Sequence, residues 1–107
     1  MISKDLTAAS SSALILSILA GGASYGYQII QSVRALSGEK IEWTDGMLYP
    51  VLHRLESRGQ IASSWKAAPS GRKRKYYSLT EEGRRALKAE REQWSIVDST
   101  LKKLWAQ

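Results

Sequence analysis

Apolar residues in the first twenty positions recur at steps of three and four, the spacing that places side chains on one face of a helix. The pattern ends at Gly21 and Gly22, and glycine commonly closes helices. We therefore predict a helix over residues 6–19. Residues 14–19 are apolar on nearly all sides, so we expect them to contact two partners, and a second subunit is one candidate. The apolar positions are Leu6, Ala9, Ala13, Leu14, Leu16 and Ile18.

A second helix is predicted from Ser24, a suitable N-cap, to Leu36. Tyr25 and Tyr27 then fall in its first turn, where free backbone N–H groups favour an anion such as a phosphate. The alternative is that these tyrosines pack their rings against the N-terminus of the helix, with their hydroxyl groups exposed to solvent. The apolar face consists of Ile29, Ile30, Val33 and Leu36. Residues 39–43 are predicted to form a short extended link to the next helix.

A third helix is predicted over residues 44–58, with Thr44 as its N-cap and Gly59 as its stop. Pro50 lacks an N–H group and would break a helix interior, so we expect the regular helix to begin near Gly46 or Met47. The buried stripe consists of Leu48, Val51, Leu52 and Leu55. The opposite face carries side chains able to meet base edges and phosphates: Met47, Tyr49, Pro50, His53, Arg54 and Ser57.

A two-stranded hairpin is predicted next, with strands at residues 60–66 and 75–79 and a tip at residues 67–74. By the period of two, Ile61, Ser63 and Trp65 share one side, and Tyr77 and Leu79 cover the same core. Four adjacent cations end the tip and begin the return strand: Arg72, Lys73, Arg74 and Lys75. A charge run is often only a solvated loop. Here the order of helix, hairpin and charged turn favours phosphate binding by a winged helix.

The last predicted helix starts after Thr80 and continues towards residue 107. At 1.5 Å per residue it would be about 40 Å long, too long to be covered by so small a domain. An apolar seam with a gap at Glu90 therefore predicts a homodimer, with Leu14 and Ile18 in the same interface. The seam consists of Leu87, Trp94, Val97, Leu101 and Leu104.

Together these patterns predict a mainly α fold with a small β-hairpin. A winged helix-turn-helix occupies residues 1–79, and a dimerisation helix occupies residues 80–107 of the same compact unit. Sixteen Lys and Arg against ten Asp and Glu give a net charge of +6, which suits a polyanionic partner. The chain has no Cys and one His, so disulfides and metal sites built from Cys or several His are excluded.

Enzymatic function is not expected, because no phosphate-binding loop, nucleophile triad or carboxylate pair is present. No cofactor is expected either. Residues 13–23 resemble a secretory signal in part, but the apolar run is short and Asp5 lies in the region that should be positive. No run approaches the roughly eighteen apolar residues of a membrane span. The function that we predict is therefore DNA binding. The alternative is a winged-helix module that binds another protein and no nucleic acid.

Three segments in this order resemble the PadR family of bacterial transcriptional regulators, specifically its short members with one C-terminal helix. They are Tyr25-Gly26-Tyr27, residues 46–56 and residues 71–80. Met47 stands where Thr is more usual. The resemblance implies a cytoplasmic homodimer, usually a repressor, that binds a palindromic operator with helix three in the major groove and wings along the backbone. It points to these DNA contacts: Tyr25, Thr44, Met47, Tyr49, Pro50, His53, Arg54, Arg72, Lys73 and Arg74.

A narrower resemblance concerns Trp94, Val97 and Asp98. They are similar to a segment of multidrug-responsive members, in which a Trp from each subunit stacks a flat compound across a central pore. The resemblance implies an effector that is planar or phenolic and often cationic, because indole faces and a carboxylate attract positive charge. The alternative is that Trp94 only packs the dimer.

Overall fold

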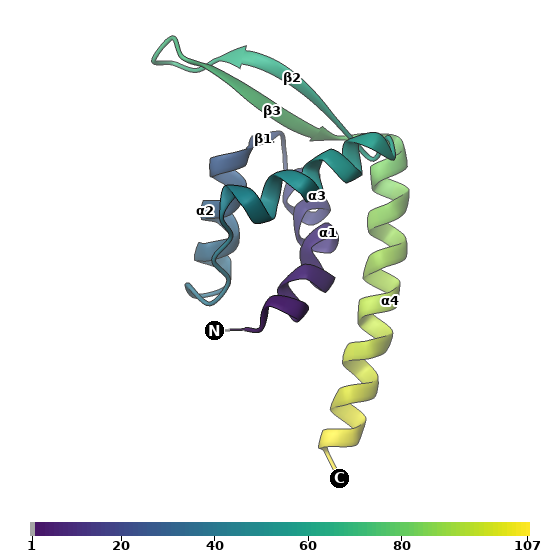
Figure 1. Ribbon diagram of the computed structural model, residues 1–107. Helices are drawn as coiled ribbons and strands as arrows, with labels where there is room; N and C mark the ends of the chain where they lie inside the picture. The colour runs from purple at the N-terminus through teal and green to yellow at the C-terminus, as the bar shows by residue number, and fades with distance from the viewer. Residues whose placement is uncertain (1) are drawn as a thin grey trace.

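Over residues 2–107, which the computed structural model describes, the chain forms four helices and a three-stranded antiparallel sheet (Figure 1). The strand order is β1-β3-β2. The predicted fold class, mainly α with a β-hairpin, is confirmed. The elements are α1 (Lys4–Ala20), β1 (Ser24–Tyr25), α2 (Gly26–Leu36), α3 (Asp45–Ser57), β2 (Ile61–Ala67), β3 (Lys73–Leu79) and α4 (Glu81–Trp105).

Side-chain caps set the starts of three helices. Thr44 accepts a hydrogen bond from the backbone N–H of Met47 at 3.3 Å, and Thr80 accepts one from Gly83 at 3.0 Å, as predicted for both. Ser3 caps α1 by accepting from the N–H of Leu6. These bonds satisfy N–H groups that have no partner within the helix. Because the Ser3 cap precedes Leu6, the first residue of the predicted apolar stripe, α1 begins two residues before the predicted start.

The prediction that Ser24 caps α2 is wrong. Ser24 and Tyr25 form the short strand β1, which pairs with Tyr77 and Tyr76 of β3, and Tyr25 is the N-cap residue of α2. The polar groups of this backbone are therefore satisfied by a distant strand rather than by a local cap. N-cap preferences consider only residues close in sequence, so they cannot predict a pairing between distant strands.

The predicted start of α3 is also wrong, because Pro50 lies inside the helix rather than in its first turn. The N–H of Leu48 already donates to the carbonyl of Thr44 at 3.0 Å, so regular helical bonding begins at the cap. Pro50 removes one hydrogen bond, the one to the carbonyl of Gly46. Gly46 is exposed, so water can take the place of that bond.

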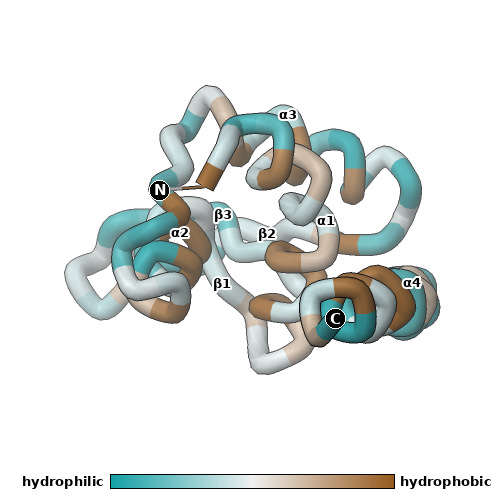
Figure 2. The backbone as a smooth tube through the Cα atoms, turned by 90° about the horizontal axis from the view of Figure 1, so that it is seen from below, coloured by the Kyte–Doolittle hydropathy of each residue, from teal (hydrophilic) through white to brown (hydrophobic). Residues whose placement is uncertain are grey.

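The core lies where α1 meets the other elements. Figure 2, viewed from below, shows α1 in the middle, with α2, α3 and α4 around it. The predicted stripe of α3 is confirmed, since Leu48, Leu52 and Leu55 are at most 1 % exposed and Val51 packs against them. The other apolar core residues are Ile15, Leu16, Leu19, Ile29, Val33, Trp43, Ile61, Tyr77 and Leu87.

The β2–β3 hairpin, called the wing from here on, is longer than predicted. Its pairing runs from Ile61 opposite Leu79 to Ala67 opposite Lys73. The return strand therefore begins at Lys73, two residues early, and the predicted tip cations Lys73 and Arg74 lie in the strand. The loop closes through the N–H of Ala68, which donates to the carbonyl of Arg72 at 2.7 Å.

Trp65 was predicted to lie in the core, and this is wrong. It lies on the same side of the wing as buried Tyr77, yet it is 66 % exposed. The wing extends beyond the helices that cover its base (Figure 1), so alternation alone does not bury its outer half.

Helix α4 changes its surroundings along its length. Near its middle, Ser12 of α1 donates a hydrogen bond to the Glu90 carboxylate at 2.8 Å. Beyond that point the helix projects past the body of the protein (Figure 1). The molecule as a whole, with this helix included, measures 56 × 29 × 21 Å. Within residues 2–107, no helix combines the length and the apolar character needed to cross a membrane.

Candidate nucleic-acid interface

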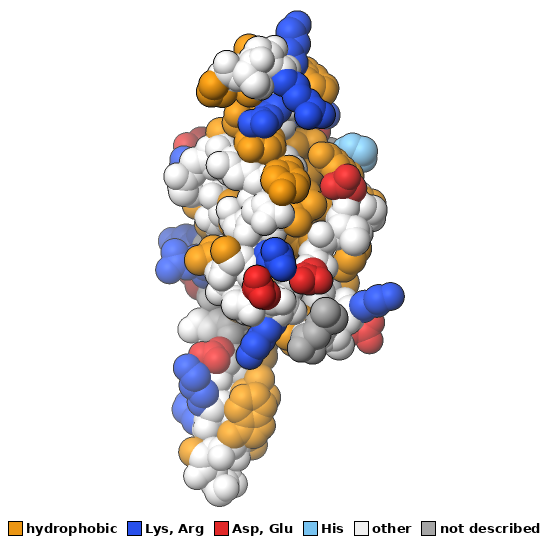
Figure 3. Space-filling model, turned by 90° about the vertical axis from the view of Figure 1, so that its left-hand side faces the viewer, with side chains coloured by type: hydrophobic (Ala, Val, Ile, Leu, Met, Phe, Trp, Pro, Cys, Tyr) orange, Lys and Arg blue, Asp and Glu red, His pale blue; other side chains and the backbone are white. Residues whose placement is uncertain are grey.

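A hollow of about 510 Å³ lies between the wing, the start of α2 and Tyr49 of α3. We call it the wing groove. Its lining includes all four cations that the sequence placed at the hairpin turn. Figure 3 shows blue Lys and Arg side chains gathered over the wing, with hydrophobic side chains, in orange, below them. The predicted DNA contacts that line the groove are Tyr25, Tyr27, Tyr49, Arg72, Lys73, Arg74 and Lys75.

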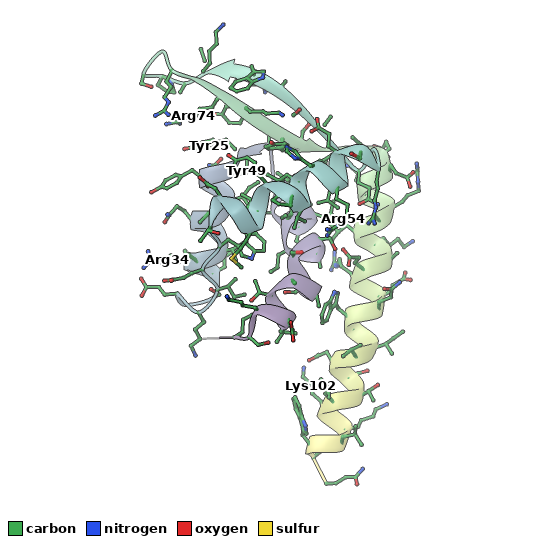
Figure 4. The ribbon with its side chains drawn as sticks, viewed as in Figure 1. Tyr25, Arg34, Tyr49, Arg54, Arg74 and Lys102 are labelled. Carbon is green, nitrogen blue, oxygen red and sulfur yellow. The ribbon has the colours of Figure 1, made fainter. Side chains whose placement is uncertain are left out.

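Tyr25 connects the wing to α2. Its ring meets the ring of Tyr76 edge-on, with 5.4 Å between centroids and 77° between planes. The Arg74 guanidinium lies 4.4 Å from the centroid of the same Tyr25 ring (Figure 4). Such a cation–π contact contributes about 0.5 to 2 kcal/mol, depending on how far water is excluded. Arg74 therefore helps to hold the wing in place as well as carrying positive charge.

Gly26 explains the middle position of the Tyr25-Gly26-Tyr27 motif. A Cβ atom at Gly26 would lie 2.5 Å from the hydroxyl oxygen of Tyr49, closer than any real contact. Only glycine lets the Tyr49 ring cross the start of α2 at this distance. The motif therefore fixes how α2 and α3 meet below the wing.

A second link holds the wing to α3. Ser63 of β2 donates a hydrogen bond to the carboxylate of Glu56 at 2.5 Å. Beside it, burial raises the pKa of Tyr77, and the nearby Tyr49 and Glu56 raise that pKa further. The Tyr77 phenol therefore stays neutral at physiological pH. It acts as a core residue, not as a contact for a ligand.

The wing cations are available to an anion. None of the ion pairs found within residues 2–107 involves a wing cation. Lys66 and Lys75 lie over the rings of Tyr76 and Tyr77, at 5.7 and 5.6 Å from the centroids. Arg72 and Lys73 are exposed. Without neighbouring carboxylates, this cluster keeps a positive potential that attracts a polyanion.

The outward side of α3 adds a polar and amphipathic strip. Pro50 and His53 lie opposite the buried stripe by the helical period, and both are exposed. In Figure 3 the single His is visible at the right edge, below the wing cations. Thr44 is exposed at the start of the helix, where its hydroxyl oxygen accepts from Met47.

Two predicted contacts lie apart from the wing groove. Met47 and Arg54 line a separate hollow on the opposite side of α3, together with residues of α1. Two further groove residues were not predicted as DNA contacts: Trp65, assigned to the core, and Gly26. The alternation of side chains along the strand correctly predicted the side of the wing on which Trp65 lies. That Trp65 is exposed to solvent follows only from the length of the hairpin in the structure.

The predicted effector and dimer residues lie in several environments. Trp94 and Leu101 are partly buried, and Val97 and Leu104 are exposed. Asp98 forms an ion pair with Lys102 at 3.0 Å. Leu87 is buried in the protomer's own core, while Leu14 and Ile18 line an apolar hollow between α1 and α2.

Several solved structures are similar over almost the whole chain. A transcriptional regulator from Clostridium thermocellum is 32 % identical, with 96 % of this chain and 97 % of that one covered and a TM-score of 0.86. A PadR family transcriptional regulator from Eggerthella lenta is 36 % identical, with 94 % and 85 % covered and a TM-score of 0.77. A PadR-like transcriptional regulator from Bacillus cereus is 27 % identical, with 94 % and 96 % covered and a TM-score of 0.84.

The sequence also matches the transcriptional regulator PadR-like family over residues 15–89. This range contains α2, α3, the whole wing and the first turns of α4. It therefore includes the wing groove, whose charge and aromatic lining suit nucleic acid. The protein is a DNA-binding transcriptional regulator rather than an enzyme, and it belongs to the PadR-like family.

Proposed function

We propose that the protein represses transcription in the cytoplasm by binding a palindromic operator as a homodimer. The observation that carries this proposal is the wing groove, in which unpaired cations lie next to the exposed side of α3. Helix α3 would enter the major groove, with Tyr49, Pro50 and His53 near base edges. The wing would follow the phosphate backbone through Arg72 and Lys73.

The distal part of α4 supports the homodimer. Val97 is 48 % exposed, Leu104 58 % and Trp105 74 %. By the helical period these residues share one face with partly buried Trp94 and Leu101. Contiguous apolar surface of this kind marks an interaction site, and a second copy of α4 would cover it. Two-fold symmetry in the protein then requires an inverted repeat in the DNA.

Selection of bound duplexes from a random pool tests the operator directly. We expect enrichment of one inverted repeat whose half-sites are about 34–36 Å apart, or one helical turn. Enrichment of an asymmetric site would contradict the homodimer. A pool that is never enriched, with no salt-dependent retention on heparin, would favour the alternative of a protein–protein module.

Release by a planar effector at Trp94 is the second part of the proposal. Trp94 is partly buried on the face expected to pair, so two copies would present their indoles to each other. We expect planar cations to quench its fluorescence and to weaken operator binding. A Trp94→Leu protein should lose both effects. If a broad panel of planar compounds causes no quenching, Trp94 serves only for packing.

A further inference from the structure

Trp65 is a large apolar side chain that the folded protein leaves open in the wing groove. It is 66 % exposed, although it lines the groove between the wing and the start of α2. Within residues 2–107 it takes part in neither an aromatic pair nor a cation–π contact, whereas Tyr25, Tyr76 and Tyr77 do. The indole of Trp65 is therefore free to contact a partner.

The strand register places Trp65 beside cations. Trp65 lies opposite Lys75 in the β2–β3 pairing, so both side chains project from the same side of the sheet. Lys73 and buried Tyr77 share that side, two residues before and two residues after Lys75. Trp65 thus lies outside the core residue Tyr77, on the side of the wing that carries Lys73 and Lys75.

The cations and the indole suit different parts of one DNA strand. Arg72 and Lys73 are exposed and can bind phosphates, which alternate with deoxyribose along the strand. The carbon atoms of deoxyribose are the apolar part of the backbone, and an indole that covers them removes apolar surface of both partners from water. A groove that holds cations and an open indole therefore fits a sugar–phosphate strand.

Insertion of Trp65 between base pairs does not fit its place in the wing. Side chains that unstack bases act as wedges that reach between base steps from the minor groove. Trp65 lies two residues before Ala67, the end of β2, and its side chain lines the groove together with residues of α2 instead of extending from the loop. Contact with a backbone sugar requires no such reach.

We propose that Trp65 packs its indole on a deoxyribose of the DNA strand whose phosphates bind Arg72 and Lys73. This contact adds affinity that does not depend on salt, because it releases no counterion. It also favours DNA over RNA, since a 2′-hydroxyl covered by the indole loses its hydrogen bonds to water. The inference rests on the proposed function, in which the wing follows the phosphate backbone.

Salt titrations separate the contribution of the indole from that of the cations. With a duplex of mixed sequence, Trp65→Ala should weaken binding about tenfold at every salt concentration and leave the slope of log affinity against log salt unchanged. Trp65→Phe keeps a smaller ring and should lose about threefold. Retention of both variants on heparin, a polyanion without deoxyribose, should match that of the parent. A substitution that only loosened the wing would misplace its cations and would lower both the slope and the retention.

Ile96→Ala is the matched control. Ile96 is 65 % exposed, almost the same as Trp65, and it lies on α4 outside the wing groove. This variant should bind DNA, RNA and heparin as the parent does. The parent should prefer a DNA duplex to an RNA duplex of the same sequence, and Trp65→Ala should reduce that preference about tenfold, because it loses affinity for DNA only.

A spectroscopic label reports the contact directly. The chain has four Trp, so protein grown with 5-fluorotryptophan gives four ¹⁹F signals, and Trp65→Phe assigns the signal of Trp65. On addition of the DNA duplex, the difference in its position between H₂O and D₂O should shrink, because the sugar excludes water from the indole. Heparin should leave that difference unchanged.

Any of four results would overturn the proposal: no loss of DNA affinity in Trp65→Ala, a fall in its salt slope, an equal loss for RNA and DNA, or a Trp65 signal that stays as exposed with DNA as without it. If the parent binds the duplex and one of these results is found, this proposal fails alone. If the parent binds no duplex at all, the proposed function fails with it.

Discussion

The wing and the distal half of α4, residues 91–105, both extend beyond the core, but they expose different chemistry. Each carries a largely exposed tryptophan, 66 % for Trp65 in the wing and 74 % for Trp105 in α4. In the wing, aromatic rings lie beside cations, as in the 4.4 Å contact between Arg74 and Tyr25. In α4, the apolar residues other than Ile96 follow one face of the helix, and Lys103 lies on the other side by the helical period.

The difference indicates which kind of partner each surface fits. Exposing cations and aromatic rings together to water costs little free energy, and the cations attract phosphates. The wing can therefore stay hydrated in the free protein and bind DNA through its charges. A continuous apolar face gains free energy only when another apolar surface covers it. An exposed tryptophan by itself does not indicate whether a surface binds DNA or another protein. The presence or absence of cations around the tryptophan distinguishes the two.

The largest effect is expected from charges placed on the apolar face of α4. In a protein with Leu101→Asp and Leu104→Asp, the proposed homodimer should not form, because carboxylates buried without partners in its interface would be strongly unfavourable. Operator affinity should then fall about a hundredfold or more, since the two half-sites no longer bind together. Sedimentation gives the mass, and fluorescence anisotropy gives the affinity.

The matched control places two charges outside that face. Ile96→Asp with Ser99→Asp adds the same charge at exposed positions on the opposite side of α4. It should remain a dimer with nearly normal operator affinity. Dissociation of both double variants alike would show that charge on α4, and not its apolar face, controls assembly.

A substitution where the wing base meets α4 should reduce stability. A Cβ atom at buried Gly83 would overlap the carbonyl oxygen of Gln60 and would lie 2.7 Å from Cδ1 of Leu79. We expect Gly83→Ala to cost about 2 kcal/mol of unfolding free energy, because a backbone atom has to move. Urea denaturation measures this loss.

Gly46→Ala is the control for helix propensity. Its nearest neighbour would be the hydroxyl oxygen of Thr44 at 3.8 Å, an ordinary contact. It should stabilise the protein by up to about 1 kcal/mol. If Gly83→Ala also stabilised the protein, the close packing of α4 on the wing base would be refuted.

Removal of the exposed wing cations should give a smaller effect that depends on salt. Arg72→Ala with Lys73→Ala should weaken binding to all DNA sequences by about tenfold near physiological salt. The slope of log affinity against log salt should fall by up to about 0.9 per lost phosphate contact. Lys88→Ala with Lys103→Ala removes the same charge from exposed positions of α4 and should leave the slope unchanged. Equal slopes for both variants and the parent would indicate that the wing faces solvent.

The smallest effect is expected at the contact between Tyr25 and Arg74. Tyr25→Leu removes the aromatic ring, so the wing should be held less firmly and operator affinity should fall about fivefold. Tyr25→Phe keeps the ring and should stay within about twofold of the parent, since cation–π contacts depend on the ring face. A larger loss in Tyr25→Phe would instead assign the hydroxyl a direct contact with phosphate.

Much of the fold could be predicted because its signals are local. The caps at Thr44 and Thr80 each depend on a residue three positions away, and the α3 stripe repeats within one helix. The cation cluster is contiguous in sequence. For the proposed interface, sequence therefore provided the residue types and the order of their elements.

Features that depend on residues far apart in the chain could not be predicted in this way. Strand β1 exists because Ser24 and Tyr25 reach β3, and that pairing displaced the expected cap. Trp65 is exposed because the wing extends further than the helices below it. The prediction for Pro50 failed for a different, local reason: regular helical bonding starts at the Thr44 cap, so Pro50 lies within α3.

The amino-acid sequence alone determined the helical stripes, the hairpin, the excess of positive charge and the family resemblance. These follow from periodicity and from hydrogen bonds between near neighbours. Only the tertiary structure decided that Tyr49 shares the wing groove while Met47 and Arg54 face α1. The physical reason is that a helix offers several flanks to its surroundings. The packing of α1, α2 and the wing determines what each flank of α3 meets.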